Sequence, residues 1–147
     1  MIQRIQTIFI LVAGLLTGSL YVQKFADIIV NDELHIFNAF GILKDQALII
    51  NGLPITIFIG LITVLHFVAI FLYKKRILQM RVLGFTMILL LGLFGMFFYF
   101  TYASFEEVKV AFKVAVALPV VCVILDWLAI RAIGKDEALV RSLDRIR

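Results

Sequence analysis

The chain has 147 residues, of which 63% are hydrophobic and only 16% are charged, so a soluble fold could not bury its apolar surface. The net charge of +4 does not indicate nucleic-acid binding, because the basic residues lie beside apolar runs and form no single dense stripe. Composition and charge therefore exclude a soluble domain and a nucleic-acid-binding protein, and they indicate an integral membrane protein.

Four apolar runs predict helices at about residues 5–23, 53–74, 81–102 and 105–133. Each run is close to the roughly 20 residues that a helix needs to cross about 30 Å of hydrocarbon. We therefore expect an all-α membrane protein, an antiparallel bundle of four transmembrane helices that forms a single domain over residues 1–147.

The first apolar run follows Arg4, a pattern that a cleaved signal peptide would share. Residues 16–21 contain no Ala-x-Ala cleavage site, so we expect the run to remain as the first helix. Gly14 and Gly18 have the spacing that lets two helices approach closely. We expect this pair to pack within the chain; a docking face for a partner helix is the alternative.

Residues 23–52 form a long connection in which large apolar residues interrupt the charges, so we expect a packed rather than a disordered loop. Within it, residues 35–43 suit either a short β-hairpin or a segment that lies on the membrane surface. The expected result is an elaborated periplasmic loop between the first two helices.

The second and third helices carry different features. Thr63 and His66 are polar residues within the second apolar run, whereas Gly92 and Gly95 narrow the third helix and favour close packing. Aromatic residues crowd the outer end of the third helix at 94–102, which is typical of a membrane interface; a groove for lipid or a partner is the alternative.

The fourth helix is expected to begin at residue 105, because Ser104 and Glu107 have the spacing of a capping box. Ala111 and Ala115 would then repeat the small-residue spacing of the first helix. Beyond Gly134, the residues predict a short amphipathic cytoplasmic helix over the tail 134–147 that contacts the membrane surface or an acidic partner.

Asp126 is the most informative residue, because a carboxylate in a transmembrane segment is costly and faces other helices or water. Arg131 is a poor partner within the helix, since five residues turn the side chain to another face. We expect Asp126 to bond to another helix, through His66, Thr63, Thr86 or a basic side chain. A structural hydrogen bond is the favoured interpretation, and a proton or ion relay through His66 and Asp126 is the alternative.

Lysine and arginine residues predict the orientation, because positively charged loops remain in the cytoplasm. One side of the predicted membrane has ten of them and the other side has four. The ten are Arg4, Lys74, Lys75, Arg76, Arg81, Arg131, Lys135, Arg141, Arg145 and Arg147, and the four are Lys24, Lys44, Lys109 and Lys113. Both termini are therefore predicted to be cytoplasmic.

The two ends of the chain carry its most specific pattern, in residues 1–7 (MIQRIQT) and 129–137 (AIRAIGKDE), with Leu139, Val140 and Ser142 after them. In these segments the chain resembles an uncharacterised family of small four-helix inner-membrane proteins of Bacteroidota, a domain of unknown function. The resemblance implies a location in the inner membrane of a Gram-negative bacterium. It implies no activity, cofactor or catalytic residue.

Signatures of catalysis are missing from the sequence, which has no phosphate loop, no nucleophile motif and no clustered metal ligands. We therefore expect no enzyme activity, no metal and no cofactor. Membrane lipids and other inner-membrane proteins are the expected partners.

The leading hypothesis is a non-catalytic accessory subunit or assembly factor of a larger inner-membrane complex. One alternative is a small proton- or ion-coupled transporter that uses Asp126 and His66. The other is a lipid-binding or membrane-organising protein, based on the aromatic third helix and the basic tail.

Overall fold

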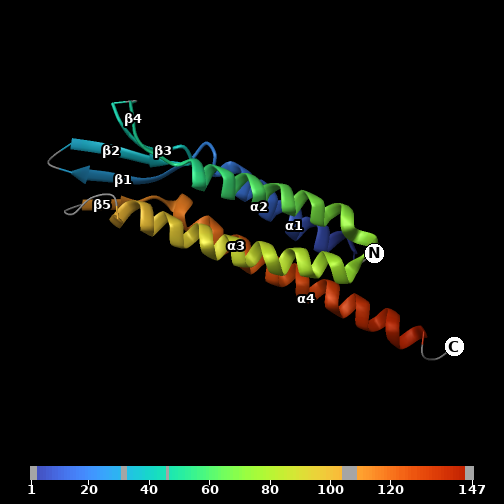
Figure 1. Cartoon of the computed structure of the whole chain (residues 1–147). Coiled ribbons are helices and arrows are strands. Elements are labelled where there is room, and N and C mark those ends of the chain that lie inside the picture. Colours follow the sequence, from blue (N-terminus) through green and yellow to red (C-terminus); the bar gives the residue numbers. More distant parts are fainter. Residues whose placement is uncertain (1–2, 31–32, 46, 104–108, 145–147) are drawn as a thin grey trace.

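The computed structural model describes residues 3–30, 33–45, 47–103 and 109–144, in which long helices pack side by side and carry a β-sheet at one end (Figure 1). The helices are α1 (Gln3–Ser19), α2 (Leu53–Phe71), α3 (Arg76–Ala103) and α4 (Leu118–Asp144). Two short 3-10 turns, η1 (Leu72–Lys74) and η2 (Val114–Ala117), precede α3 and α4. The expected separate tail helix is wrong, because α4 continues through Gly134 without a break.

Each helix packs chiefly against two neighbours, so the helices form a ring in the order α1, α2, α3, α4. Within the described residues, three helical segments are long and apolar enough to cross a membrane, namely 53–74, 76–103 and 114–140, and α1 is a shorter apolar helix. These segments make the structure compatible with a membrane protein. The third helix begins at Arg76 rather than at residue 81, because η1 turns the chain sharply just before it.

A five-stranded antiparallel sheet lies beyond one end of the helices, so the expected all-α bundle is wrong. The strands are β1 (Lys24–Val30), β2 (Glu33–Asn38), β3 (Gly41–Lys44), β4 (Ala47–Asn51) and β5 (Lys109–Phe112), in the order β4-β3-β2-β1-β5. Of the two alternatives for residues 35–43, the structure has the hairpin.

The expected start of the fourth helix is replaced by β5, which pairs with β1 in the register Ala26 with Phe112 and Ile28 with Val110. Lys109 and Lys113 have a helical spacing in the sequence, but pairing with a distant strand overrides this local preference. The capping box of Ser104 and Glu107 lies outside the described residues. The fourth helix itself begins at Leu118, with Pro119 in its first turn, where a missing N–H has no cost.

The sheet has one face that packs on the helices. Phe25 and Phe37 of this face meet Phe97 of α3, with ring centroids 4.4 and 6.2 Å apart. Because side chains alternate along a strand, Ile28 and Ile42 point the same way and are fully buried. The inner face therefore fixes the sheet against the end of α3.

Close backbone packing joins the sheet to α2. Gly52 N–H donates a hydrogen bond of 2.7 Å to the Phe40 carbonyl oxygen. Gly41 has φ +133°, and a Cβ atom there would lie 1.9 Å from the Ile50 carbonyl oxygen. Only glycine fits at this position, so the turn before β3 depends on it.

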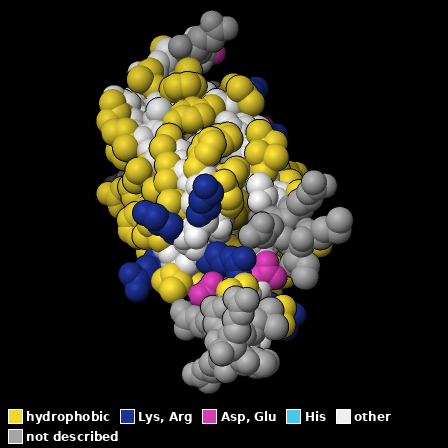
Figure 2. All heavy atoms as spheres, turned by 90° about the vertical axis from the view of Figure 1, so that its right-hand side faces the viewer, with side chains coloured by type: hydrophobic (Ala, Val, Ile, Leu, Met, Phe, Trp, Pro, Cys, Tyr) yellow, Lys and Arg dark blue, Asp and Glu magenta, His cyan; other side chains and the backbone are white. Residues whose placement is uncertain are grey.

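Helix α1 begins and α4 ends at the end of the molecule opposite the sheet (Figure 1). Figure 2, which looks onto that end, shows Lys and Arg side chains gathered beside a broad hydrophobic surface. The molecule thus has a basic end and a sheet end, separated by apolar helices.

Candidate functional site

Asp126 of α4 is the centre of a buried polar cluster that links three helices. His66 Nε2 of α2 lies 3.1 Å from Asp126 Oδ1 and 3.2 Å from Oδ2. Thr86 Oγ1 of α3 lies 2.9 Å from Asp126 Oδ2. All three side chains have no exposed surface. The cluster therefore crosses the ring of helices from α2 to α4, with α3 completing it.

The first helix reaches this cluster because Gly14 has no side chain. A Cβ atom at Gly14 would lie 3.1 Å from His66 Cβ, which is tighter than an ordinary contact. One turn further on, Gly18 faces Thr63 Cγ2 at 3.7 Å from the position of a Cβ atom. Both glycines thus pack against α2 of the same chain.

The hydrogen bonds of His66 fix where protons can lie. Nδ1 is 2.9 Å from the Ile62 carbonyl oxygen, which only accepts, so Nδ1 must carry a hydrogen. Nε2 faces both carboxylate oxygens of Asp126. Without a proton between Nε2 and these oxygens, the lone pair of Nε2 would face the lone pairs of the oxygens. A hydrogen bond between His66 and Asp126 therefore needs one proton between Nε2 and the carboxyl group. This hydrogen bond limits the cost of placing two ionisable side chains among apolar helices.

Thr86 has two acceptors within reach of its one hydroxyl hydrogen. Its Oγ1 is 2.7 Å from the Leu83 carbonyl oxygen and 2.9 Å from Asp126 Oδ2. The one hydroxyl hydrogen can go to either acceptor, but the carboxyl group cannot donate to Thr86, because the proton of the His66–Asp126 hydrogen bond lies toward Nε2.

Two further polar side chains extend the contacts toward α1, and sequence reasoning missed both. Cys122, one turn before Asp126, directs its Sγ to the Ala13 carbonyl oxygen at 3.6 Å. Thr17 Oγ1 donates to the same carbonyl at 2.5 Å. The helical spacing of Cys122 and Asp126 was the available signal, because residues four apart lie on one face.

Several predicted site residues do not join the cluster. Thr63 donates to the Ile59 carbonyl oxygen of its own helix. Gly92 packs beside Phe58, and a Cβ atom added at Gly95 would have nothing within 4 Å of it. Ala111 lies in β5, and Ala115 is buried in η2, so the two do not form a helix-packing pair.

Apolar side chains bound the cluster on both sides along α3. The buried residues of this helix next to Thr86 are Leu83 toward the basic end and Leu90 and Leu93 toward the sheet. Among the described residues, no group of three or more His, Cys, Asp or Glu side chains could hold a metal ion. The geometry is that of an enclosed hydrogen-bonded connection between helices.

The outer face of the sheet is a second candidate site, because nothing in the described part of the chain packs on it although it has apolar side chains beside the charged Lys24, Asp27 and Lys109. Pairing places Ile29 opposite Leu34 and Ile36 opposite Leu43, which in turn pairs with Leu48. Leu34 and Leu48 are 55% and 53% exposed. A cavity of about 410 Å³ opens on this face, and Lys24, Leu34, Ile36, Asn38, Leu43 and Asp45 line it.

The two edges of the described sheet differ in charge. β5 has Lys109 within the strand and Lys113 just after it, and Lys113 Nζ lies 2.5 Å from Asp27 Oδ2. β4 contains neither a charged residue nor a proline, and Leu48 and Ile49 are exposed. Because charges and prolines protect edge strands from unwanted pairing, β4 is the unprotected edge.

An exposed ion pair connects β2 and β3 near this edge. Lys44 Nζ donates to Glu33 Oε2. This hydrogen bond, together with the positive charge of Lys44, lowers the pKa of Glu33 below its ordinary value of 4.5. The pair joins the first residue of β2 to the last residue of β3, at the open end of the hairpin.

The predicted basic residues fall into two groups. Lys74, Lys75, Arg76 and Arg81 line one cavity at the basic end. The side chain of Arg141 lies outside the described part of the structure, as do Arg145 and Arg147.

Comparison with known proteins identifies a family for this chain. The model of a family described as a domain of unknown function (DUF4293) matches residues 2–146. No curated protein and no solved structure matches the chain.

Proposed function

This chain belongs to the DUF4293 family, a domain of unknown function, and we propose that it is a non-catalytic accessory subunit of a larger membrane complex. The observation that carries the proposal is the set of uncovered apolar side chains on the outer face of the sheet. Ile29, Leu34 and Leu48 expose 41%, 55% and 53% of their surface there. A contiguous apolar surface beyond the end of the membrane helices is typical of a protein interface.

The unprotected edge of β4 indicates how a partner binds. An edge strand presents unpaired N–H and C=O groups, and an extended segment of a partner can add to it as a further strand. Exposed Leu48 and Ile49 supply apolar contacts on alternate sides of such a strand. The expected partner is therefore a membrane protein with an extended segment outside the membrane.

We further propose an inner-membrane location with the sheet on the periplasmic side and both termini in the cytoplasm. The excess of Lys and Arg at the basic end supports this orientation. Helix α1 lies lengthwise between α2 and α4, so it crosses the membrane together with them. At about 1.5 Å per residue its length is close to the hydrocarbon thickness.

The test is affinity purification of the tagged full chain from its native membranes in mild detergent, with mass spectrometry of the proteins that accompany it. We expect a stoichiometric membrane partner, and loss of this partner in a chain with Leu34→Lys and Leu48→Lys. Val22→Lys is the matched control, because Val22 is 86% exposed just before β1 but lies outside the sheet. A chain that purifies alone would count against the proposal.

A small proton-coupled transporter is a second candidate, motivated by the shared proton of His66 and Asp126. Asp126→Asn separates the two functions, because an amide keeps hydrogen bonds to His66 and Thr86 but cannot take up or release a proton. An accessory subunit with this substitution keeps its partner and its cellular role. A transporter would lose its flux while remaining folded.

A further inference from the structure

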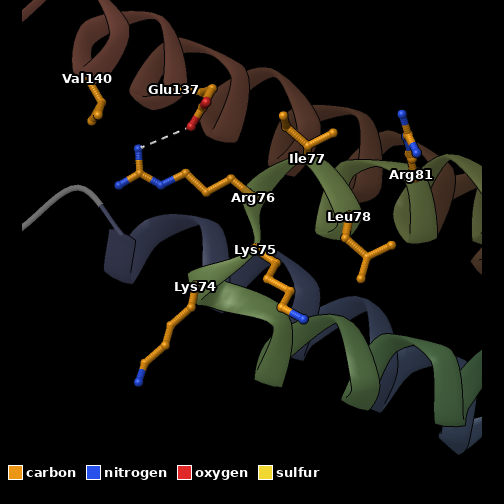
Figure 3. Close-up of a pocket in the computed structure, with 8 residues that line it drawn as sticks. All are labelled: Lys74, Lys75, Arg76, Ile77, Leu78, Arg81, Glu137 and Val140. Atoms are coloured by element: carbon orange, nitrogen blue, oxygen red, sulfur yellow. Dashed lines mark ion pairs between the residues drawn. The ribbon is translucent and has the colours of Figure 1, made fainter. Parts of the chain in front are cut away.

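A cavity of about 560 Å³ opens at the basic end of the molecule, between η1, the start of α3 and the end of α4 (Figure 3). Its lining combines charged and apolar side chains. They are Lys74, Lys75, Arg76, Ile77, Leu78, Arg81, Glu137 and Val140. The cavity is distant from the cluster around Asp126 and from the outer face of the sheet.

The charges of this cavity are unbalanced. Four cationic side chains share its lining with one carboxylate, that of Glu137. Figure 3 shows the Arg76 guanidinium turned toward Glu137, and the nearest atoms, Arg76 Nη1 and Glu137 Oε2, are 3.9 Å apart. This distance exceeds a hydrogen bond, so Glu137 neutralises only part of the positive charge.

Arg76 also has an unused donor. Its Nη1 atom is buried and has no hydrogen-bond acceptor within the described part of the chain. A buried donor of this kind is costly unless an acceptor occupies the neighbouring space. Because Nη1 has no exposed surface and faces Glu137, the positive charge around the cavity, and not this donor, is what favours an anion there.

The first turn of α3 adds partial positive charge to that of the basic side chains. Arg76, Ile77 and Leu78 form this turn, and their peptide N–H groups have no hydrogen-bond acceptor within the helix. The hydrogen bond from Gln79 N–H to the Lys75 carbonyl oxygen is where the helical pattern begins. Helix N-termini of this type bind phosphate groups.

The apolar part of the lining identifies the source of the phosphate. Ile77, Leu78 and Val140 are exposed by 44%, 42% and 42%. A cavity that is cationic on one side and apolar on the other, where membrane-spanning helices end, matches a lipid headgroup and the start of its acyl chains.

We propose that this cavity binds the phosphate of an anionic phospholipid. The Arg76 guanidinium, Lys74, Lys75 and Arg81 supply the positive charge that the phosphate meets. Ile77 and Leu78 contact the glycerol backbone and the first methylene groups. The lipid would thereby hold α3 and α4 together at the membrane surface.

The test is native mass spectrometry of the full chain, released from detergent after incubation with equal amounts of phosphatidylglycerol and phosphatidylcholine. We expect preferential retention of phosphatidylglycerol by about tenfold, with a loss of that preference in Arg76→Gln, Arg81→Gln chains. The matched control is Arg131→Gln with Lys135→Gln, which removes the same charge from exposed positions of α4 outside the cavity. Equal loss in the control would overturn the proposal, since binding would then follow total charge alone.

Two additional measurements keep the result decisive. Lys74→Gln with Lys75→Gln changes exposed residues only, so it reports on the cavity even if the Arg76 variant does not fold. Competition with inorganic phosphate and glycerol 3-phosphate tests the source of the anion. We expect neither to displace the lipid at equal concentration; displacement by either would show a site for free phosphate and overturn the lipid assignment.

Discussion

His66 Nε2 lies 3.1 Å from Asp126 Oδ1, although α2 and α4 stand on opposite sides of the ring of helices. The pair therefore spans the centre of the core, and α1 and α3 close around it. Gly14 allows the approach of α1, and Thr86 of α3 completes the hydrogen bonds. A single buried contact thus depends on all four helices.

Asp126→Leu should destabilise the protein by about 3 kcal/mol, because it leaves the buried Nε2 of His66 without a hydrogen-bond partner, whereas Thr86 still donates to the Leu83 carbonyl oxygen. Unfolding in mixed micelles with increasing denaturing detergent measures the change. Thr63→Val is the control, since Thr63 bonds only within its own helix, and it should cost less than about 1 kcal/mol.

Combining Asp126→Leu with His66→Leu should recover most of that loss. Two apolar side chains of similar volume leave no unpaired polar group, and replacing both partners of a buried pair costs about 1 kcal/mol or less. The double-mutant cycle measures the coupling between the residues. Additive losses would show that the two side chains do not act as a pair.

Gly14→Val should destabilise the protein by about 1–3 kcal/mol, because a Cβ atom at this position already lies 3.1 Å from His66 Cβ. Gly95→Val is the matched control within α3, where nothing lies within 4 Å of the added atom. The same unfolding measurement compares the two. Equal effects would mean that backbone preference, not packing against His66, determines the cost.

The position of the sheet relative to the membrane can be tested by labelling. Val22→Cys in spheroplasts should react with a membrane-impermeant maleimide, because Val22 is 86% exposed at the sheet end. Leu139→Cys, at the basic end of α4, should react only after permeabilisation. Native Cys122 is buried and adds little background. Labelling in the reverse pattern would invert the proposed orientation.

The Glu33–Lys44 ion pair predicts a salt-sensitive effect of pH on the hairpin. Because the pKa of Glu33 is lowered in the folded state, the pair stabilises the hairpin above the ordinary value of 4.5, and this contribution is lost as the pH falls through the lowered pKa. Lys44→Met should return the pKa of Glu33 toward 4.5 in a carboxyl NMR titration. Lys113→Met, which removes the partner of Asp27 instead, should leave Glu33 unchanged.

The polar cluster shows how far sequence reasoning reaches within the core. Asp126 in an apolar run requires a partner on another helix, and His66, Thr63 and Thr86 were the candidates. Which of these residues contacts Asp126 depends on the rotation of each helix about its axis. The pattern of hydrophobic residues does not specify this rotation when a helix is apolar on all sides. The structure selects His66 and Thr86, whereas Thr63 turns to its own backbone.

The apolar runs by themselves determined that the chain is suited to a membrane, because hydrogen bonds within a helix satisfy the backbone of each run locally. The uneven distribution of Lys and Arg likewise predicted one basic end. Only the tertiary structure decided the sheet, since β1 must pair with β5, far away in the chain, and such pairing leaves no local pattern in four residues. Strands depend on neighbours that are distant in sequence, whereas helices depend on residues one turn away.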